Sequence, residues 1–164
     1  MTDHPRYIGP AARFFEDFTL GERIVSQGRT VTPADGLFWS MFTGDMNPMH
    51  VDYDYASKHG LFGGAFPAGL TTIAIASGLM ERLGLSAGTG LAIIEQTIRY
   101  KSVVLFGETI RIELHVAALK SHATKPQGKV SFDYKVVKSD GEVAIEGEWI
   151  WLFAGRGSIA APAP

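Results

Sequence analysis

One segment constrains the fold more than any other: the stretch from Pro67 to about Gly84, whose apolar residues recur at helical spacing on every side. They are Leu70, Ile73, Ile75, Ala76, Leu79, Met80 and Leu83. A helix that is apolar all round is a buried helix, because no face of it prefers water. At 1.5 Å per residue it would run roughly 27 Å, the length of a small domain. We therefore expect the rest of the chain to enclose this helix.

Downstream of Gly88, apolar residues alternate with polar ones, which is typical of half-buried β-strands. The alternating sets are Ile94, Ile98 and Tyr100; Ile110, Ile112, Leu114 and Val116; Val130, Phe132, Tyr134 and Val136; and Val143, Ile145, Trp149, Trp151 and Phe153. Ser139-Asp140-Gly141 joins the last two runs, and Asp-Gly favours a tight hairpin turn. With a first strand over residues 22–31, these runs predict an α+β fold, an antiparallel sheet of about five strands curled around the long helix.

A second, shorter helix is predicted to begin after Thr32. Thr32 suits the N-cap, Pro33 the first helical position and Asp35 the first turn. Gly44 is expected to end the helix. The pattern predicts that this helix carries four apolar side chains into the core, namely Leu37, Phe38, Met41 and Phe42.

Length and composition limit the classes of protein that the chain can form. Its 164 residues suit one domain, with a body from about Phe14 to Arg156 and loose, Pro-, Gly- and Ala-rich ends at 1–13 and 157–164. The absence of cysteine excludes thiolate chemistry and suggests a cytoplasmic location. A net charge of −2 without a basic face argues against nucleic acid as a partner. Neither a signal peptide nor a membrane span is expected.

Metal ions and cofactors are not expected. Four of the histidines have no partner at metal-ligand spacing: His4, His59, His115 and His122. The glycines between Gly60 and Gly64 lack the lysine and the strand–helix context of a phosphate-binding loop.

The loop between the two predicted helices concentrates the chemistry. Asp45 and His50 lie five residues apart, and Asn47-Pro48 forces a turn that lets both side chains face one space. A carboxylate and an imidazole that share one water can act as an acid/base pair. The structural alternative is that Asp45 caps a turn and His50 is an ordinary loop histidine, and residue types alone favour that alternative.

A resemblance favours the catalytic interpretation. It rests on Gly44-Asp45-Met46-Asn47-Pro48-Met49-His50-Val51-Asp52, then Tyr55-Ala56 and Phe62-Gly63-Gly64, with flanking matches at Phe15-Glu16-Asp17-Phe18, Arg29-Thr30-Val31-Thr32 and Phe106-Gly107-Glu108-Thr109. These segments resemble the MaoC-like dehydratases, the (R)-specific enoyl-CoA hydratases. The resemblance implies the hot-dog fold, at least a homodimer, and reversible hydration of a trans-2-enoyl-CoA to an (R)-3-hydroxyacyl-CoA. Coenzyme A would enter only as part of the substrate.

Family roles can be carried onto individual positions of this chain. Asp45 and His50 match the pair that activates water, and Gly69 matches a glycine whose backbone N–H binds the thioester oxygen. A helix N-terminus suits that last role, because its N–H groups are free and carry partial positive charge. Ser77 matches a serine that orients the aspartate. The structural alternatives are close helix packing at Gly69 and a merely small residue at Ser77.

The sequence departs from the family just before this glycine. The family usually has His-Gly there, whereas this chain reads Phe66-Pro67-Ala68-Gly69. The departure bears on substrate preference and fine geometry more than on the class of reaction.

The substrate pocket is predicted around the short helix and the segment 60–66. Asn47 and the aromatic residues Phe38, Phe42, Phe62 and Phe66 are the candidates for contact with the substrate, and their bulk favours short or branched acyl chains. A branched or dicarboxylic enoyl-CoA would fit the same reaction. Two other functions stay open: an acyl-CoA thioesterase, and a non-catalytic acyl-CoA-binding module.

Overall fold

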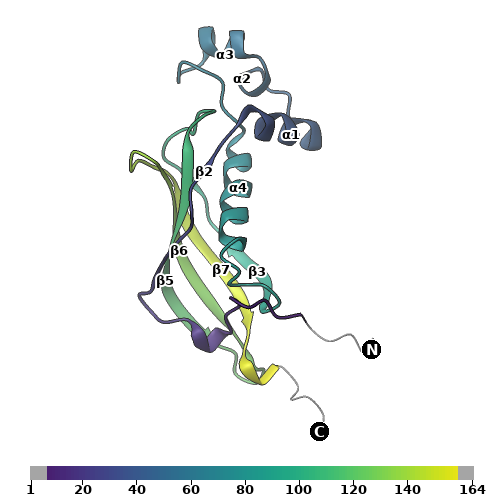
Figure 1. Cartoon of the computed structure of the whole chain (residues 1–164), viewed down its shortest axis with the longest axis vertical. Coiled ribbons are helices and arrows are strands. Elements are labelled where there is room, and N and C mark those ends of the chain that lie inside the picture. The colour runs from purple at the N-terminus through teal and green to yellow at the C-terminus, as the bar shows by residue number, and fades with distance from the viewer. Residues whose placement is uncertain (1–6, 159–164) are drawn as a thin grey trace.

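Seven antiparallel strands form one sheet in the computed structural model, which describes residues 7–158 (Figure 1). Five strands lie side by side in the order β1 (Arg23–Val25), β5 (Thr109–Ser121), β6 (Gln127–Lys138), β7 (Val143–Ala154) and β3 (Gly90–Gln96). The two short additions are β2 (Arg29–Thr30), which pairs with β5, and β4 (Arg99–Tyr100), which pairs with β7. The α+β architecture is confirmed, and the strand count exceeds the expected five because two predicted strands are each interrupted.

The interruption of the first predicted strand has a local cause. Between β1 and β2 the Ser26 hydroxyl accepts a hydrogen bond from the backbone N–H of Ile112 at 3.0 Å. A side chain thus replaces one backbone partner of the ladder, and regular pairing resumes only at Arg29.

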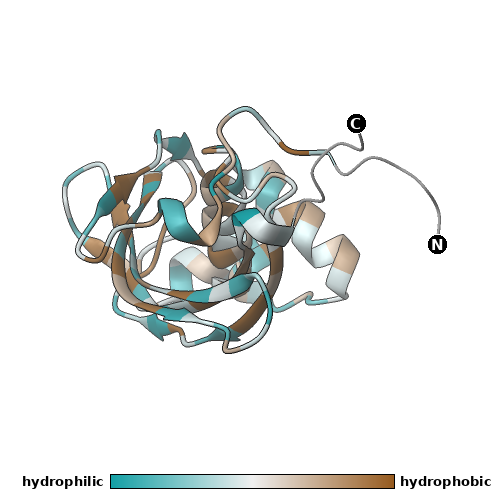
Figure 2. Cartoon of the chain, turned by 90° about the horizontal axis from the view of Figure 1, so that it is seen from below, coloured by the Kyte–Doolittle hydropathy of each residue, from teal (hydrophilic) through white to brown (hydrophobic). Residues whose placement is uncertain are grey.

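The long helix, α4 (Gly69–Glu81), lies against the concave face of the sheet, which curls around it (Figure 2). The inward-facing side chains of the central strands are almost completely buried, as are Leu79 and Met80 of the helix. The helix is shorter than expected, and its burial is incomplete. Leu70, Ala74 and Gly78 follow one another at every fourth position on a solvent-exposed stripe, because the sheet covers only one side of the helix.

Three short helices form a cap beyond the N-terminal end of α4: α1 (Pro33–Thr43), α2 (Pro48–Val51) and α3 (Tyr53–His59) (Figure 1). The predicted limits of α1 are confirmed. Thr32 is the N-cap, and its backbone N–H donates to the Asp35 carboxylate at 2.8 Å. Gly44 ends the helix in the left-handed conformation, at a φ of 78°.

The predicted burial of the apolar face of α1 is wrong. The four side chains expected in the core are 57–77% exposed: Leu37, Phe38, Met41 and Phe42. The helix instead turns its small residues, Gly36 and Ser40, toward the body. A Cβ added at Gly36 would lie 2.6 Å from Cζ of Phe106, so only glycine permits this approach. Contact through small residues leaves the opposite, apolar face outside.

The two ends of the described chain meet at the base of the sheet. They carry the 3₁₀ turns η1 (Phe15–Asp17) and η2 (Arg156–Ser158), which an ion pair between Arg156 and Asp17 joins. Upstream, the backbone N–H of Gly9 donates to the carbonyl of Ala87 at 2.8 Å, so hydrogen bonding begins earlier than the predicted body. The remaining predicted loose ends, 1–6 and 159–164, lie outside the described residues.

Candidate active site

A cavity of about 550 Å³ lies where the cap meets the N-terminal end of α4. Five of the residues singled out from the sequence line it: Asp45, His50, Phe62, Phe66 and Gly69. Segments far apart in the chain therefore converge on one space of a size suited to a small molecule.

The His50 ring is held in a defined orientation. Its Nδ1 lies 2.9 Å from the carbonyl oxygen of Phe66. A carbonyl can only accept a hydrogen bond, so Nδ1 carries the proton and Nε2 of the neutral ring keeps its lone pair. Phe66 also packs edge-on against the imidazole, with ring centroids 5.2 Å apart, and Phe62 packs edge-on against Phe66. The segment that departs from the family pattern thus orients the histidine.

The Asp45 carboxylate is partly buried and is held by short-range hydrogen bonds. The backbone N–H of Asn47 donates to Oδ1 of Asp45 at 3.3 Å. The Thr43 hydroxyl accepts from the backbone N–H of Asp45 at 3.2 Å and donates to the carbonyl of Trp39 at 2.8 Å. Thr43 therefore couples Asp45 to the last turn of α1.

Gly69 is the first residue of α4, and its glycine identity has a steric reason. A Cβ at this position would lie 2.7 Å from Cε1 of Tyr100. The N-cap, Ala68, has no side chain that could cap the helix, and among residues 7–158 no acceptor is found for the Gly69 N–H. A free, partly positive N–H group therefore faces the cavity region at the helix start. Close packing and an oxyanion-binding role are both compatible with this position.

The other predicted site residues lie elsewhere. The Asn47 side chain caps α2 by accepting from the backbone N–H of Met49 at 3.0 Å. Phe42 and Phe38 line a second cavity on the other flank of α4. Ser77 is half-buried in α4 and lines neither cavity. The predicted substrate contacts of Asn47, Phe38 and Phe42 stay predictions, as does the predicted contact of Ser77 with Asp45.

Several lining residues were not recognised from the sequence, namely Trp39, Thr72, Tyr100, Lys101 and Ser102. Burial raises the pKa of Tyr100, so its phenol stays protonated at neutral pH and can donate a hydrogen bond. The only sequence signal for these residues was that the apolar–polar alternation stops after Tyr100. A segment that leaves a strand for a loop often carries binding residues.

Neither a metal site nor a membrane-spanning helix is found in the part of the chain that the structure describes. No group of three or more His, Asp or Glu side chains is placed to hold a metal ion. No helix within residues 7–158 has the length and apolar character needed to cross a membrane.

Comparison with known proteins places this arrangement in a family. Residues 17–138 match the family described as the MaoC like domain. The (R)-specific enoyl-CoA hydratase of Rhodospirillum rubrum is 27% identical over 88% of this chain and 94% of its own length. The 3-hydroxyacyl-[acyl-carrier-protein] dehydratase FERN, mitochondrial, of Solanum lycopersicum is 29% identical over 76% of this chain and 72% of its own length.

Solved structures agree with this match. The crystal structure of the MaoC-like dehydratase from Rhodospirillum rubrum has a TM-score of 0.74 at 25% identity and covers 88% of this chain and 98% of that one. A double-hotdog protein from Mycobacterium tuberculosis has a TM-score of 0.77 at 16% identity, covering 95% of this chain and 48% of that one, and supports the fold alone. The protein has the hot-dog fold and belongs to the MaoC-like domain family.

Proposed function

We propose that the protein catalyses reversible hydration of a trans-2-enoyl thioester, with Asp45 and His50 as its acid/base pair. One observation carries the proposal: the His50 Nδ1 contact with the Phe66 carbonyl, in the cavity that Asp45 and the start of α4 also line. This contact leaves Nε2 with a lone pair for water or a proton. A histidine held only as a packing residue would not require that orientation.

The proposed chemistry follows from these groups. A water between Asp45 and His50 loses a proton to one of them as its oxygen attacks the β-carbon of the enoyl group. Negative charge then develops on the thioester oxygen, where the Gly69 N–H at the helix start stabilises it. The proton that the pair took from the water is then delivered to the α-carbon, which restores the starting protonation of the pair.

Substrate and stereochemistry are finer parts of the proposal. The relative from Rhodospirillum rubrum is named as (R)-specific and as acting on enoyl-CoA, and we extend both properties to this chain. The tomato relative is named for an acyl-carrier-protein substrate, which makes a carrier-protein thioester the alternative. Parallel assays with coenzyme A and carrier-protein thioesters distinguish the two.

We also propose a homodimer formed through β3. This strand is the sheet edge opposite β1, and it exposes Leu91, Ile93 and Ile94 to 43–48%. An exposed edge offers unpaired backbone groups, and a second copy can satisfy both these groups and the apolar side chains. Light scattering should give twice the chain mass, and Ile93→Lys should lower it. The absence of cysteine supports a cytoplasmic location within the same proposal.

Matched pairs of variants test the acid/base assignment. Asp45→Asn and His50→Gln should each slow hydration by about 100-fold or more. Asp52→Asn and His59→Gln are the controls, because Asp52 caps α3 and neither residue lines the cavity. Asparagine caps helices as well as aspartate, so the Asp52 control should fold normally.

The outcome separates the proposed function from its rivals. Loss of activity in the cavity variants with full activity in both controls supports the proposal. Equal activity in all four variants contradicts the assignment. Release of free thiol by the wild-type chain would favour a thioesterase, which the same fold also supports.

A further inference from the structure

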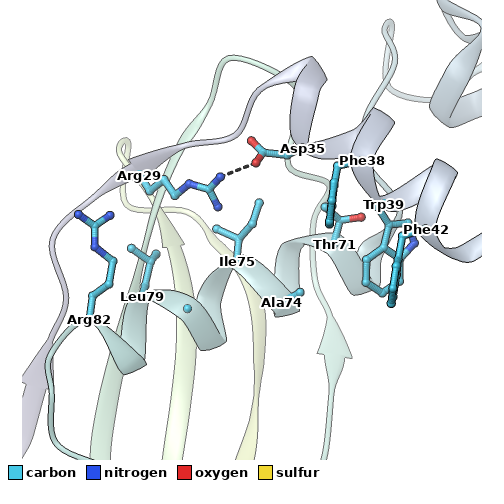
Figure 3. Close-up of a pocket in the computed structure, with 11 residues that line it drawn as sticks. Arg29, Asp35, Phe38, Trp39, Phe42, Thr71, Ala74, Ile75, Leu79 and Arg82 are labelled. Atoms are coloured by element: carbon cyan, nitrogen blue, oxygen red, sulfur yellow. Dashed lines mark hydrogen bonds and ion pairs between the residues drawn. The ribbon is translucent and has the colours of Figure 1, made fainter. Parts of the chain in front are cut away.

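A second cavity, of about 470 Å³, adjoins the candidate active site across α4 and α1 (Figure 3). One residue lines both cavities: Trp39. Figure 3 shows Phe38, Trp39 and Phe42 at one end of the second cavity and Arg82 at the other. Phe38 and Phe42 make the end next to Trp39 largely apolar, whereas Arg29 and Arg82 lie toward the far end. Trp39 is therefore the wall between the site and an apolar space.

Helix α4 places the two cavities against each other. Thr72 lines the candidate active site, and its neighbour Thr71 lines the second cavity. Thr71 is 4% exposed, yet its hydroxyl has no hydrogen-bond partner among the described residues. An unpaired hydroxyl in a buried wall is costly unless a bound group or water completes it. The two cavities are thus separated only by adjacent residues of α4 and by Trp39.

Three sets of contacts hold helix α1, and with it Trp39, in place. An ion pair between Arg29 and Asp35 fixes the start of α1, and Gly36 packs directly against the Phe106 ring. The Thr43 hydroxyl donates to the carbonyl of Trp39 itself. Helix α1 therefore cannot withdraw Trp39 without breaking contacts at several points along its length.

We propose that Trp39 sets the acyl-chain limit of the enzyme. With its thioester at Gly69, a short acyl chain ends against the indole, and the space behind it becomes a distal acyl subsite only when the indole is removed. The inference rests on the proposed hydratase function and adds a preference for short chains together with the residue that enforces it. Each additional methylene buried in the opened space should increase the specificity constant about fourfold.

The test compares hydration of crotonyl-CoA and trans-2-decenoyl-CoA by the full chain. Trp39→Ala should raise the ratio of kcat/KM for decenoyl over crotonyl by about tenfold or more. Ala74 lines only the second cavity, at its solvent-exposed side, so Ala74→Phe should narrow that cavity. In the Trp39→Ala background it should return the ratio to near the wild-type value, whereas alone it should leave crotonyl-CoA hydration unchanged.

The possible outcomes distinguish failure of the Trp39 inference from failure of the proposed hydratase function. An unchanged ratio in a folded Trp39→Ala variant overturns the inference, as does a wild-type enzyme that hydrates decenoyl-CoA as well as crotonyl-CoA. If Trp39→Ala fails to fold, Trp39→Leu carries the same test, because leucine also opens part of the wall. A wild-type chain that hydrates no enoyl thioester would instead refute the proposed function.

Discussion

The cap and the body of this protein use similar apolar residues in opposite ways. On β5, Ile110, Ile112, Leu114 and Val116 are at most 1% exposed. On α1, by contrast, four large apolar side chains are more than half exposed: Leu37, Phe38, Met41 and Phe42. In the body, apolar area removed from water stabilises the fold. In the cap, a contiguous exposed apolar surface next to two cavities indicates binding rather than stability. Mutations in the body should therefore reduce stability, and mutations in the cap should alter turnover.

The largest expected effect comes from emptying the core. Phe132→Ala removes a fully buried ring that packs against Phe18 and Phe153. We expect a loss of about 3–5 kcal/mol in the free energy of unfolding, measured by urea denaturation. The same truncation at the exposed Met41 of the cap should change it by less than about 0.5 kcal/mol. Similar losses at both positions would contradict the division between body and cap.

The junction between the two regions should respond in turnover more than in stability. Gly69→Ala places a methyl group against the Tyr100 ring, which must swing away within the cavity. We expect hydration to slow by about 10- to 100-fold, since small displacements at a reacting centre are costly. Unfolding free energy should change little, because the Tyr100 ring is free to move. Adding Tyr100→Ala should restore part of the rate, and a double variant no faster than Gly69→Ala would show that the clash is not the cause.

The anchor of the cap should show a pH dependence. Burial raises the pKa of Asp35, but hydrogen bonds from Thr32 and the Arg29 guanidinium outweigh it and hold the pKa below 3.8. Such a carboxylate stabilises the fold above its unfolded pKa, and this stability is lost as the pH falls through the folded value.

Asp35→Asn should accordingly cost about 1 kcal/mol at neutral pH, a value reduced because Arg29 is partly exposed. The difference from wild type should shrink when urea denaturation is repeated below about pH 3.8. The matched control is Asp54→Asn, whose ion pair with Lys58 is well exposed and should contribute little. A pH-independent difference would contradict the anchoring role of the Asp35 charge.

The smallest expected effect concerns the link between α1 and the loop that carries Asp45. Thr43→Val keeps the shape of the side chain but removes both hydrogen bonds that join Trp39 to Asp45. We expect hydration to slow by about three- to tenfold. Thr43→Ser retains the hydroxyl and should restore the wild-type rate. Equal rates for the valine and serine variants would mean that this link does not position Asp45.

Much of the body could be predicted from the sequence because its side chains follow simple periods. The alternation of β5 and β6 correctly identified their buried residues, and Asp140-Gly141 marked the hairpin, where Gly141 has a φ of 93°. Local chemistry also located the limits of α1. In these strands, the alternation of apolar and polar residues along the chain shows directly which side chains face the core.

The cap could not be predicted in the same way. Helical periodicity shows that α1 has an apolar face but does not say which face meets the body, and contact through Gly36 reversed the expectation. Asp45 and His50, which were predicted from a short family motif, do line one cavity, because few residues separate them in the chain. Tyr100 lies far from that motif in the chain, and the pairing of β4 with β7 brings it to the cavity. Trp39 lies only six residues before Asp45, but the helical pattern of α1 does not show that its side chain lines the cavity.

The most direct test of the central claim is to identify the product formed from crotonyl-CoA by the wild-type chain. Chromatography with mass detection follows both the acyl thioester and free coenzyme A. The acid/base account predicts a product heavier by one water with its thioester intact. Free coenzyme A as the product, or tight binding of crotonyl-CoA without any product, would contradict it.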